Sequence, residues 1–187
     1  SLYLLKRDLG KASNKPKFRE MFSKSRAINL LSAARLFLFG ARDVWFVVGV
    51  PVFLYASGWT FTMVGGFLAL WTIGYGVVQA SAPTVVRRSA DGLSAEVPAA
   101  RWWSLALAVV PAGLAIALGR GIAHPDLVLV VGLCVFGIAF AVNSSLHSYL
   151  ILPYAGSEKT AEDVGFYYAA NAAGRFAGVA LSGALYQ

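Results

Sequence analysis

Hydrophobic residues along this chain are gathered into long stretches that short polar segments separate. The stretches predict membrane-spanning helices over residues 29–55, 59–83, 102–118, 126–153 and 164–187. Most have about the 20 residues that a helix needs to cross the hydrocarbon core, and none alternates in the manner of barrel strands. The pattern therefore predicts an all-α fold, a polytopic membrane helical bundle of about five transmembrane helices whose outer surface contacts the lipid bilayer.

Composition supports this prediction and excludes a soluble globular domain. Hydrophobic residues make up 58% of the 187 residues and charged residues 13%, with a mean hydropathy of +0.64. Ordinary soluble domains carry about a quarter charged residues. A surface this apolar is suited to lipid and not to water.

Basic residues predict the orientation of the bundle. The net charge is +7, and eight lysines and arginines precede the first complete span, within a segment over residues 6–28. Twelve basic residues lie on that side of the membrane, against Arg120 alone on the other. Positive charge accumulates on the cytoplasmic side, so residues 6–28 are predicted to form a cytoplasmic linker of an inner (plasma) membrane protein. No nucleic-acid partner is expected, because the spans leave no soluble platform for one.

Four ionisable residues fall inside predicted spans, where each costs about 2.5 to 3.5 kcal/mol on insertion scales. They are Arg35, Arg42 and Asp43 in the first span and Arg175 in the fifth. Arg35 and Arg42 are seven residues apart and share a helix face. Guanidinium forks suit carboxylate or phosphate oxygens, so the three arginines are predicted to bind an anionic substrate, with Arg35 at the cytoplasmic entrance. Asp43 is predicted to hold an arginine or to couple transport to protons, and a purely structural Asp43–Arg175 pair is the alternative.

Further polar residues recur at helical spacing on the later spans. Tyr168 and Asn171 share one face of the fifth span with Arg175, and Asn143 adds a polar position on the fourth span. We predict that these side chains contribute to substrate binding, although membrane helices also use such groups to bind one another. His147 is a candidate for ion pairing or proton coupling. The lone Cys134 and the scattered histidines have no metal-ligand spacing, so neither a metal nor a cofactor is expected.

Two segments carry a family resemblance. The run Ala33-Ala34-Arg35-Leu36-Phe37-Leu38-Phe39-Gly40-Ala41-Arg42-Asp43-Val44-Trp45-Phe46 resembles the seventh helix of organoarsenical-efflux permeases of the major facilitator superfamily, and Gly165 to Arg175 resembles their eleventh. The resemblance implies the C-terminal half of a transporter. In that arrangement residues 1–5 are the end of a preceding helix, and residues 29–187 form the C-terminal bundle, truncated before its last helix. The N-terminal half, missing here, would be its partner.

The resemblance also implies a function. Such permeases export 1-arseno-3-phosphoglycerate, a small and multiply anionic molecule, and thereby confer arsenate resistance. The alternative keeps the fold and changes the cargo to another organic anion, a sugar phosphate or a drug. A membrane-embedded enzyme is a further alternative, but the spans show neither paired carboxylates at catalytic spacing nor a nucleophile beside a base. We therefore expect a secondary active transporter and not an enzyme.

Overall fold

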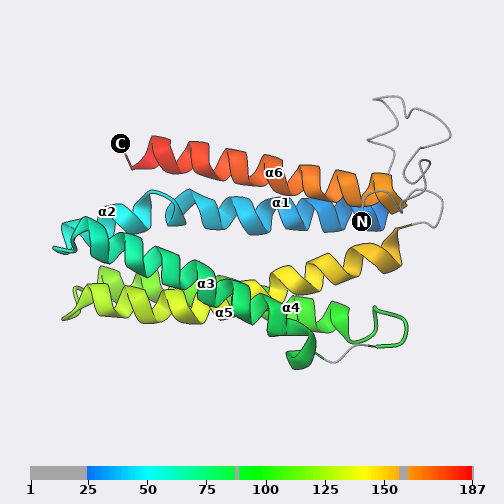
Figure 1. Ribbon diagram of the computed structural model, residues 1–187, viewed down its shortest axis with the longest axis horizontal. Helices are drawn as coiled ribbons and strands as arrows, with labels where there is room; N and C mark the ends of the chain where they lie inside the picture. Colours follow the sequence, from blue (N-terminus) through cyan, green and yellow to red (C-terminus); the bar gives the residue numbers. More distant parts are fainter. Residues whose placement is uncertain (1–24, 87–88, 156–159, 187) are drawn as a thin grey trace, which may run out of the picture.

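The structure is a computed structural model, which describes residues 25–86, 89–155 and 160–186. The predicted helix end over residues 1–5 and most of the predicted linker over residues 6–28 lie outside this part of the chain. Within it, every regular element is a helix, as Figure 1 shows. The helices are α1 (Arg26–Phe46), α2 (Gly49–Ala56), α3 (Phe61–Val85), α4 (Glu96–Gly119), α5 (Pro125–Tyr154) and α6 (Thr160–Leu185). The all-α prediction is confirmed.

Four segments of the described chain are long and apolar enough to cross a membrane. They are Arg26–Ala56, Phe61–Thr84, Glu96–Gly119 and Pro125–Tyr154. Large side chains such as Leu70 and Trp102 are more than two-thirds exposed on α3 and α4, as suits a surface that contacts lipid. The chain is therefore a multi-pass helical membrane bundle. Helix α6 has 26 residues but is less apolar, so the fifth span stays a prediction.

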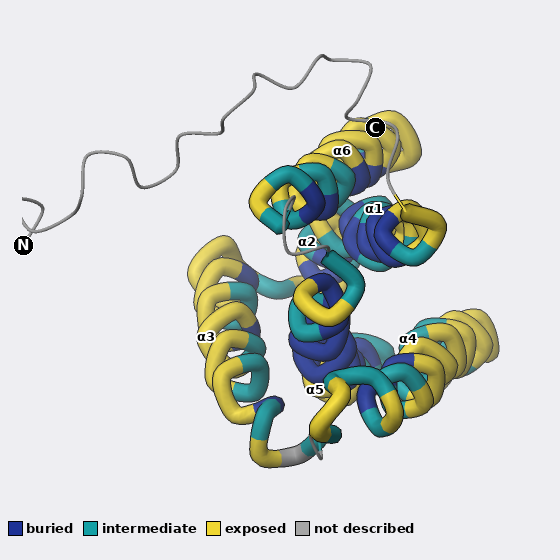
Figure 2. Tube along the Cα trace, turned by 90° about the vertical axis from the view of Figure 1, so that its right-hand side faces the viewer, coloured by how far each residue is buried: buried dark blue, intermediate teal, exposed yellow. Residues whose placement is uncertain are grey.

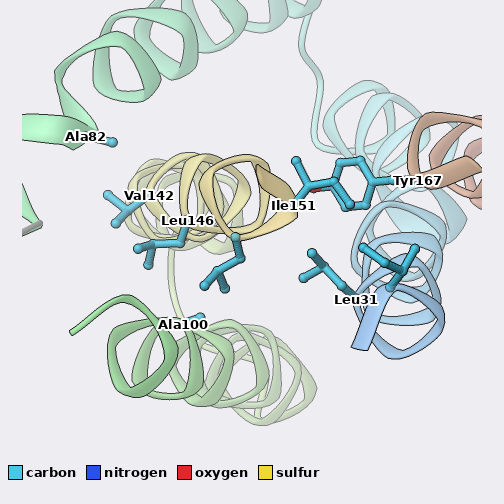
Figure 3. Packing of buried hydrophobic residues seen from close by; sticks show 9 residues of the cluster. Leu31, Ala82, Ala100, Val142, Leu146, Ile151 and Tyr167 are labelled. Atoms are coloured by element: carbon cyan, nitrogen blue, oxygen red, sulfur yellow. The ribbon is translucent and has the colours of Figure 1, made fainter. Parts of the chain in front are cut away.

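Helix α5 is the centre of the bundle. More than half of its most apolar stretch is buried inside the protein, 56%, compared with 6% for α3 and none for α4. Figure 2 shows α5 between α3 and α4, with α1 and α2 along a third side, and the outer faces of α3 and α4 are exposed. Figure 3 shows the packing near one end of α5, where side chains from five helices meet: Leu31, Ala82, Ala100, Val142, Leu146, Ile151 and Tyr167.

The first predicted span is not one continuous helix. The α-helical pattern stops at Phe46 and resumes at Gly49, a break that is visible in Figure 1. Pro51 has no N–H for the carbonyl of Val47, and its ring clashes with a straight helix at that point. Within the break, the N–H of Val48 donates to the Ser182 hydroxyl at 3.2 Å. Ser182 is fully buried on α6, and its hydroxyl is a hydrogen-bond acceptor for a backbone N–H that cannot bond to water in the membrane.

The orientation can be tested by cysteine labelling. In a Cys134→Ala background we expect Ala123→Cys, in the α4–α5 connection, to react with a membrane-impermeant maleimide from the non-cytoplasmic side only. Ala90→Cys, exposed in the α3–α4 connection, is the control and should react from the cytoplasmic side. Labelling of position 123 from the cytoplasm would show that the predicted orientation is inverted.

Candidate anion-binding site

One carboxylate lies between two guanidinium groups at the contact of α1 and α6. Arg42 donates to Asp43 Oδ1 through Nε at 2.7 Å and also through Nη2, and Arg175 Nε donates to Asp43 Oδ2 at 3.3 Å. The Asp43 side chain is 1% exposed, whereas the side chains of Arg42 and Arg175 are 11% and 56% exposed. The expected Asp43–Arg175 pair is present, and Asp43 also pairs with Arg42. Two positive charges share one negative charge, so the cluster of Arg42, Asp43 and Arg175 has a formal charge of +1.

Glycines allow the two helices to approach closely enough for this cluster to form. A Cβ atom on Gly174 would lie 2.2 Å from the Leu36 carbonyl oxygen, and one on Gly178 would lie 2.5 Å from the Gly40 carbonyl oxygen. Real Cβ atoms do not approach backbone so closely, so only glycine fits at these positions. The pair Gly174 and Gly178 marks a close helix contact, as expected from small residues four apart, and α1 is the helix that packs there.

Arg35, which was predicted at the cytoplasmic entrance, is enclosed between helices of this bundle. Its Nη1 donates to the backbone carbonyl and to the hydroxyl of Ser144, each at 3.0 Å. The guanidinium lies over the rings of Phe39 and Tyr167, with its Cζ 4.3 and 5.2 Å from their centroids. Arg35 is 5% exposed, and no described carboxylate forms an ion pair with it. These contacts connect α1 to α5 and α6, and a direct role for Arg35 in binding substrate stays a prediction.

The polar face expected on α6 is divided by the packing. Tyr168 is 49% exposed and lies on the open side of the helix together with Arg175. Asn171 is half-buried, and its Oδ1 has no hydrogen-bond partner among the described residues. Figure 2 shows that one side of α6 is exposed along its length. The fold therefore leaves Tyr168 and Arg175 accessible to a partner or ligand, while Asn171 is largely covered.

A cavity of about 500 Å³ lies between α1, α4 and α5 and is lined in part by Arg42. Asn143 and His147 line it from α5, and Asn143 Nδ2 donates to the hydroxyl of Ser104 on α4 at 3.2 Å. Asn143 Oδ1 and His147 Nδ1 have no hydrogen-bond partner in the described part of the chain. The rest of the lining is apolar: Ala34, Phe37, Leu38, Ala41, Trp45, Leu107, Ala108, Pro111, Phe136 and Phe140. We call this cavity the α1/α4/α5 groove.

Sequence reasoning missed the buried tyrosine and serine of α6. Tyr167 and Ser182 are fully buried against neighbouring helices, whereas the neighbouring Tyr168 was expected at the site. A signal was available, because Tyr167, Gly174, Gly178 and Ser182 follow each other at intervals of seven, four and four residues. That spacing defines the face that α6 turns toward the rest of the bundle.

The α3–α4 connection, at the predicted cytoplasmic end, is ordered by side-chain hydrogen bonds. Asp91 Oδ1 accepts from the N–H groups of Leu93 and Ser94 and from the Ser94 hydroxyl, each at 3.0 Å. These bonds favour the charged carboxylate and lower the pKa of Asp91 below its ordinary value. Glu96, in the first turn of α4, accepts from the N–H of Ser89 at 3.0 Å. Residues 89–95 of the connection are therefore held by hydrogen bonds beside the start of α4.

No group of three or more histidine, cysteine or acidic side chains in the described ranges is arranged to hold a metal ion. Comparisons of the chain with protein-family models, with curated proteins and with solved structures give no match in any of the three. The fold and site therefore define the class of protein, a multi-pass membrane protein with a positively charged cluster inside its helical bundle.

Proposed function

We propose that this chain is part of a secondary active transporter for organic anions. The observation that carries the proposal is the cluster of Arg42, Asp43 and Arg175, in which two guanidinium groups share one carboxylate within apolar helices. An unmatched positive charge is costly in such surroundings, and a bound anion would compensate it. Arginine also offers forked donors that match carboxylate and phosphate oxygens.

The open side of α6 supports a transport site over a structural ion cluster. Arg175 is 56% exposed there, with Tyr168 two turns away along the same side. A charged side chain exposed to hydrocarbon costs about 2.5 to 3.5 kcal/mol, so this side of α6 is expected to line a water-filled pathway or to contact protein. We propose that an N-terminal half of the transporter faces it, with alternating access to a site between the two halves in the inner (plasma) membrane.

Two cargo candidates follow from the proposal. The resemblance of residues 33–46 and 165–175 to organoarsenical-efflux permeases of the major facilitator superfamily favours 1-arseno-3-phosphoglycerate, which would make the protein an arsenate-resistance exporter. A second candidate, another organic anion, is favoured by the aromatic side chains around Arg42. Its Cζ lies 5.1 Å from the Phe39 centroid and 4.8 Å from the Phe140 centroid. A neutral drug would leave the positive cluster uncompensated and is disfavoured.

Uptake into everted membrane vesicles separates these candidates. We expect vesicles that contain the complete transporter to accumulate an anionic cargo. Three cargoes should be compared: arsenylated phosphoglycerate formed in place from arsenate by the glycolytic dehydrogenase, ordinary 3-phosphoglycerate and an aromatic carboxylate. Vesicles without the protein are the control. Equal uptake of all three anions by both kinds of vesicle would refute anion transport, and hydrolysis of the arsenate ester by purified protein would instead indicate an enzyme.

A further inference from the structure

The α1/α4/α5 groove extends away from Arg42 along one face of α5. Phe140 lies against the Arg42 guanidinium, and Asn143 and His147 follow it at three and seven residues. With a rise of 1.5 Å per residue, these two side chains lie about 4.5 and 10.5 Å further along the helix axis. The groove therefore presents a cationic end and, roughly 10 Å away, a polar end.

The polar end has unused hydrogen-bonding capacity. Asn143 is 1% exposed and His147 is 6% exposed. Asn143 Oδ1 and His147 Nδ1 have no partner among the described residues, although both side chains line the groove. Buried polar atoms without a partner cost about 1 to 3 kcal/mol each, so a ligand that bonds them gains affinity and specificity.

Charge limits what the groove can accept. The cluster of Arg42, Asp43 and Arg175 has a formal charge of +1, which a single negative charge neutralises. The other buried arginine, Arg35, does not line the groove and donates to Ser144. The remaining walls come from side chains such as Phe37, Leu107 and Phe136, which offer contact area and no donors. A second negative charge placed among them would lack a partner, and burying an unpaired charge is costly.

We propose that the groove is a subsite that selects singly charged organic anions with a flat apolar body and a hydroxyl or N–H group at the far end. The carboxylate of such a molecule pairs with Arg42, the body lies between the aromatic and aliphatic walls, and the hydroxyl bonds Asn143 or His147. This inference rests on the proposed anion transport and favours the second cargo candidate over the multiply anionic arsenical. About 500 Å³ is sufficient for a two-ring aromatic molecule.

Binding of four matched naphthalenes to the purified protein in lipid nanodiscs tests the proposal. The probe 6-hydroxy-2-naphthoate has a carboxylate and a hydroxyl at opposite ends. Its comparators lack the hydroxyl (2-naphthoate), lack the charge (6-hydroxy-2-naphthamide) or carry a second charge (2,6-naphthalenedicarboxylate). Affinity can be followed by energy transfer from tryptophan, since Trp45 lines the groove. We expect the hydroxynaphthoate to bind roughly tenfold more tightly than each comparator.

Variants connect this preference to the groove. The double variant Asn143→Ala and His147→Ala should bind hydroxynaphthoate and naphthoate equally, and Arg42→Gln should bind neither appreciably. Ser81→Ala is the control, because its hydroxyl bonds the Val77 carbonyl on its own helix, away from the groove. If the double variant keeps the full preference, or if all four naphthalenes bind equally, the subsite is wrong. In that case, vesicle uptake that depends on Arg42 would still support the proposed anion transport. If vesicle uptake does not depend on Arg42, both the subsite and the anion transport are wrong.

Discussion

Arg42→Ala and Arg175→Ala are each expected to abolish anion export by the complete transporter, and with it arsenate resistance if the cargo is the arsenical. Either change leaves Asp43 with one remaining arginine, so the formal charge of the cluster falls from +1 to zero. The anion then loses a charge-assisted pair, and removal of such a partner costs about 2 to 5 kcal/mol. That corresponds to a loss of roughly 30-fold or more in binding.

Export and membrane abundance must be measured together. Because one Asp43–arginine pair survives in each variant, the amount of protein in the membrane should stay close to that of the unaltered protein. Arg120→Ala provides the matched control, since Arg120 is exposed at the end of α4 and outside the site. Arg42→Lys keeps the charge but loses the fork, and we expect it to retain only part of the export. Normal export by both alanine variants would remove the arginine cluster from the mechanism.

Gly174→Val is expected to have the largest effect on stability. The added side chain begins at a Cβ position 2.2 Å from the Leu36 carbonyl oxygen, which is backbone and cannot rotate away. Helices α1 and α6 must then separate, and the Asp43–Arg175 contact at 3.3 Å is lost with the close approach. Overpacking typically costs about 1 to 3 kcal/mol, and a clash with helix backbone belongs at the upper end. The midpoint of thermal unfolding in detergent should fall accordingly.

Gly183 is a control on the same helix. A Cβ there meets nothing within 4 Å, so Gly183→Val should leave the unfolding midpoint nearly unchanged. The difference between the two valine variants reports mainly the helix contact, because valine is introduced in place of glycine on the same helix in both. If both variants unfold at the same temperature, the close approach of α1 and α6 does not contribute to stability.

The all-helical fold and its membrane character could be predicted from sequence, whereas the start of α4 at Glu96, six residues before the predicted span, could not. Continuous apolar stretches require helices, because in lipid every backbone N–H and C=O must bond within its own segment. The interruption of the first span was missed, although Pro51 was visible. A proline alone does not show whether a helix kinks or ends. In the folded protein the N–H of Val48, inside the break, donates to the buried hydroxyl of Ser182, 134 residues away in the chain.

The candidate site was only partly predictable. Spacing along one helix placed Arg35 and Arg42 on a shared face, but their environments differ. Ser144, Phe39 and Tyr167 enclose Arg35, whereas Arg42 lines a groove. Which neighbour surrounds a side chain depends on how helices pack, and the periodicity of one helix contains no information about the next.

Hydropathy and charge act on each segment locally, so a bundle of apolar helices that contains guanidinium groups could be predicted without the fold. Tertiary structure alone decided which charges are compensated. The close contact of α1 and α6 at Gly174 brings Asp43 and Arg175, separated by 132 residues, within 3.3 Å. Such long-range proximity arises from packing of surfaces that are distant in the chain, and it leaves the cluster of Arg42, Asp43 and Arg175 with one net positive charge.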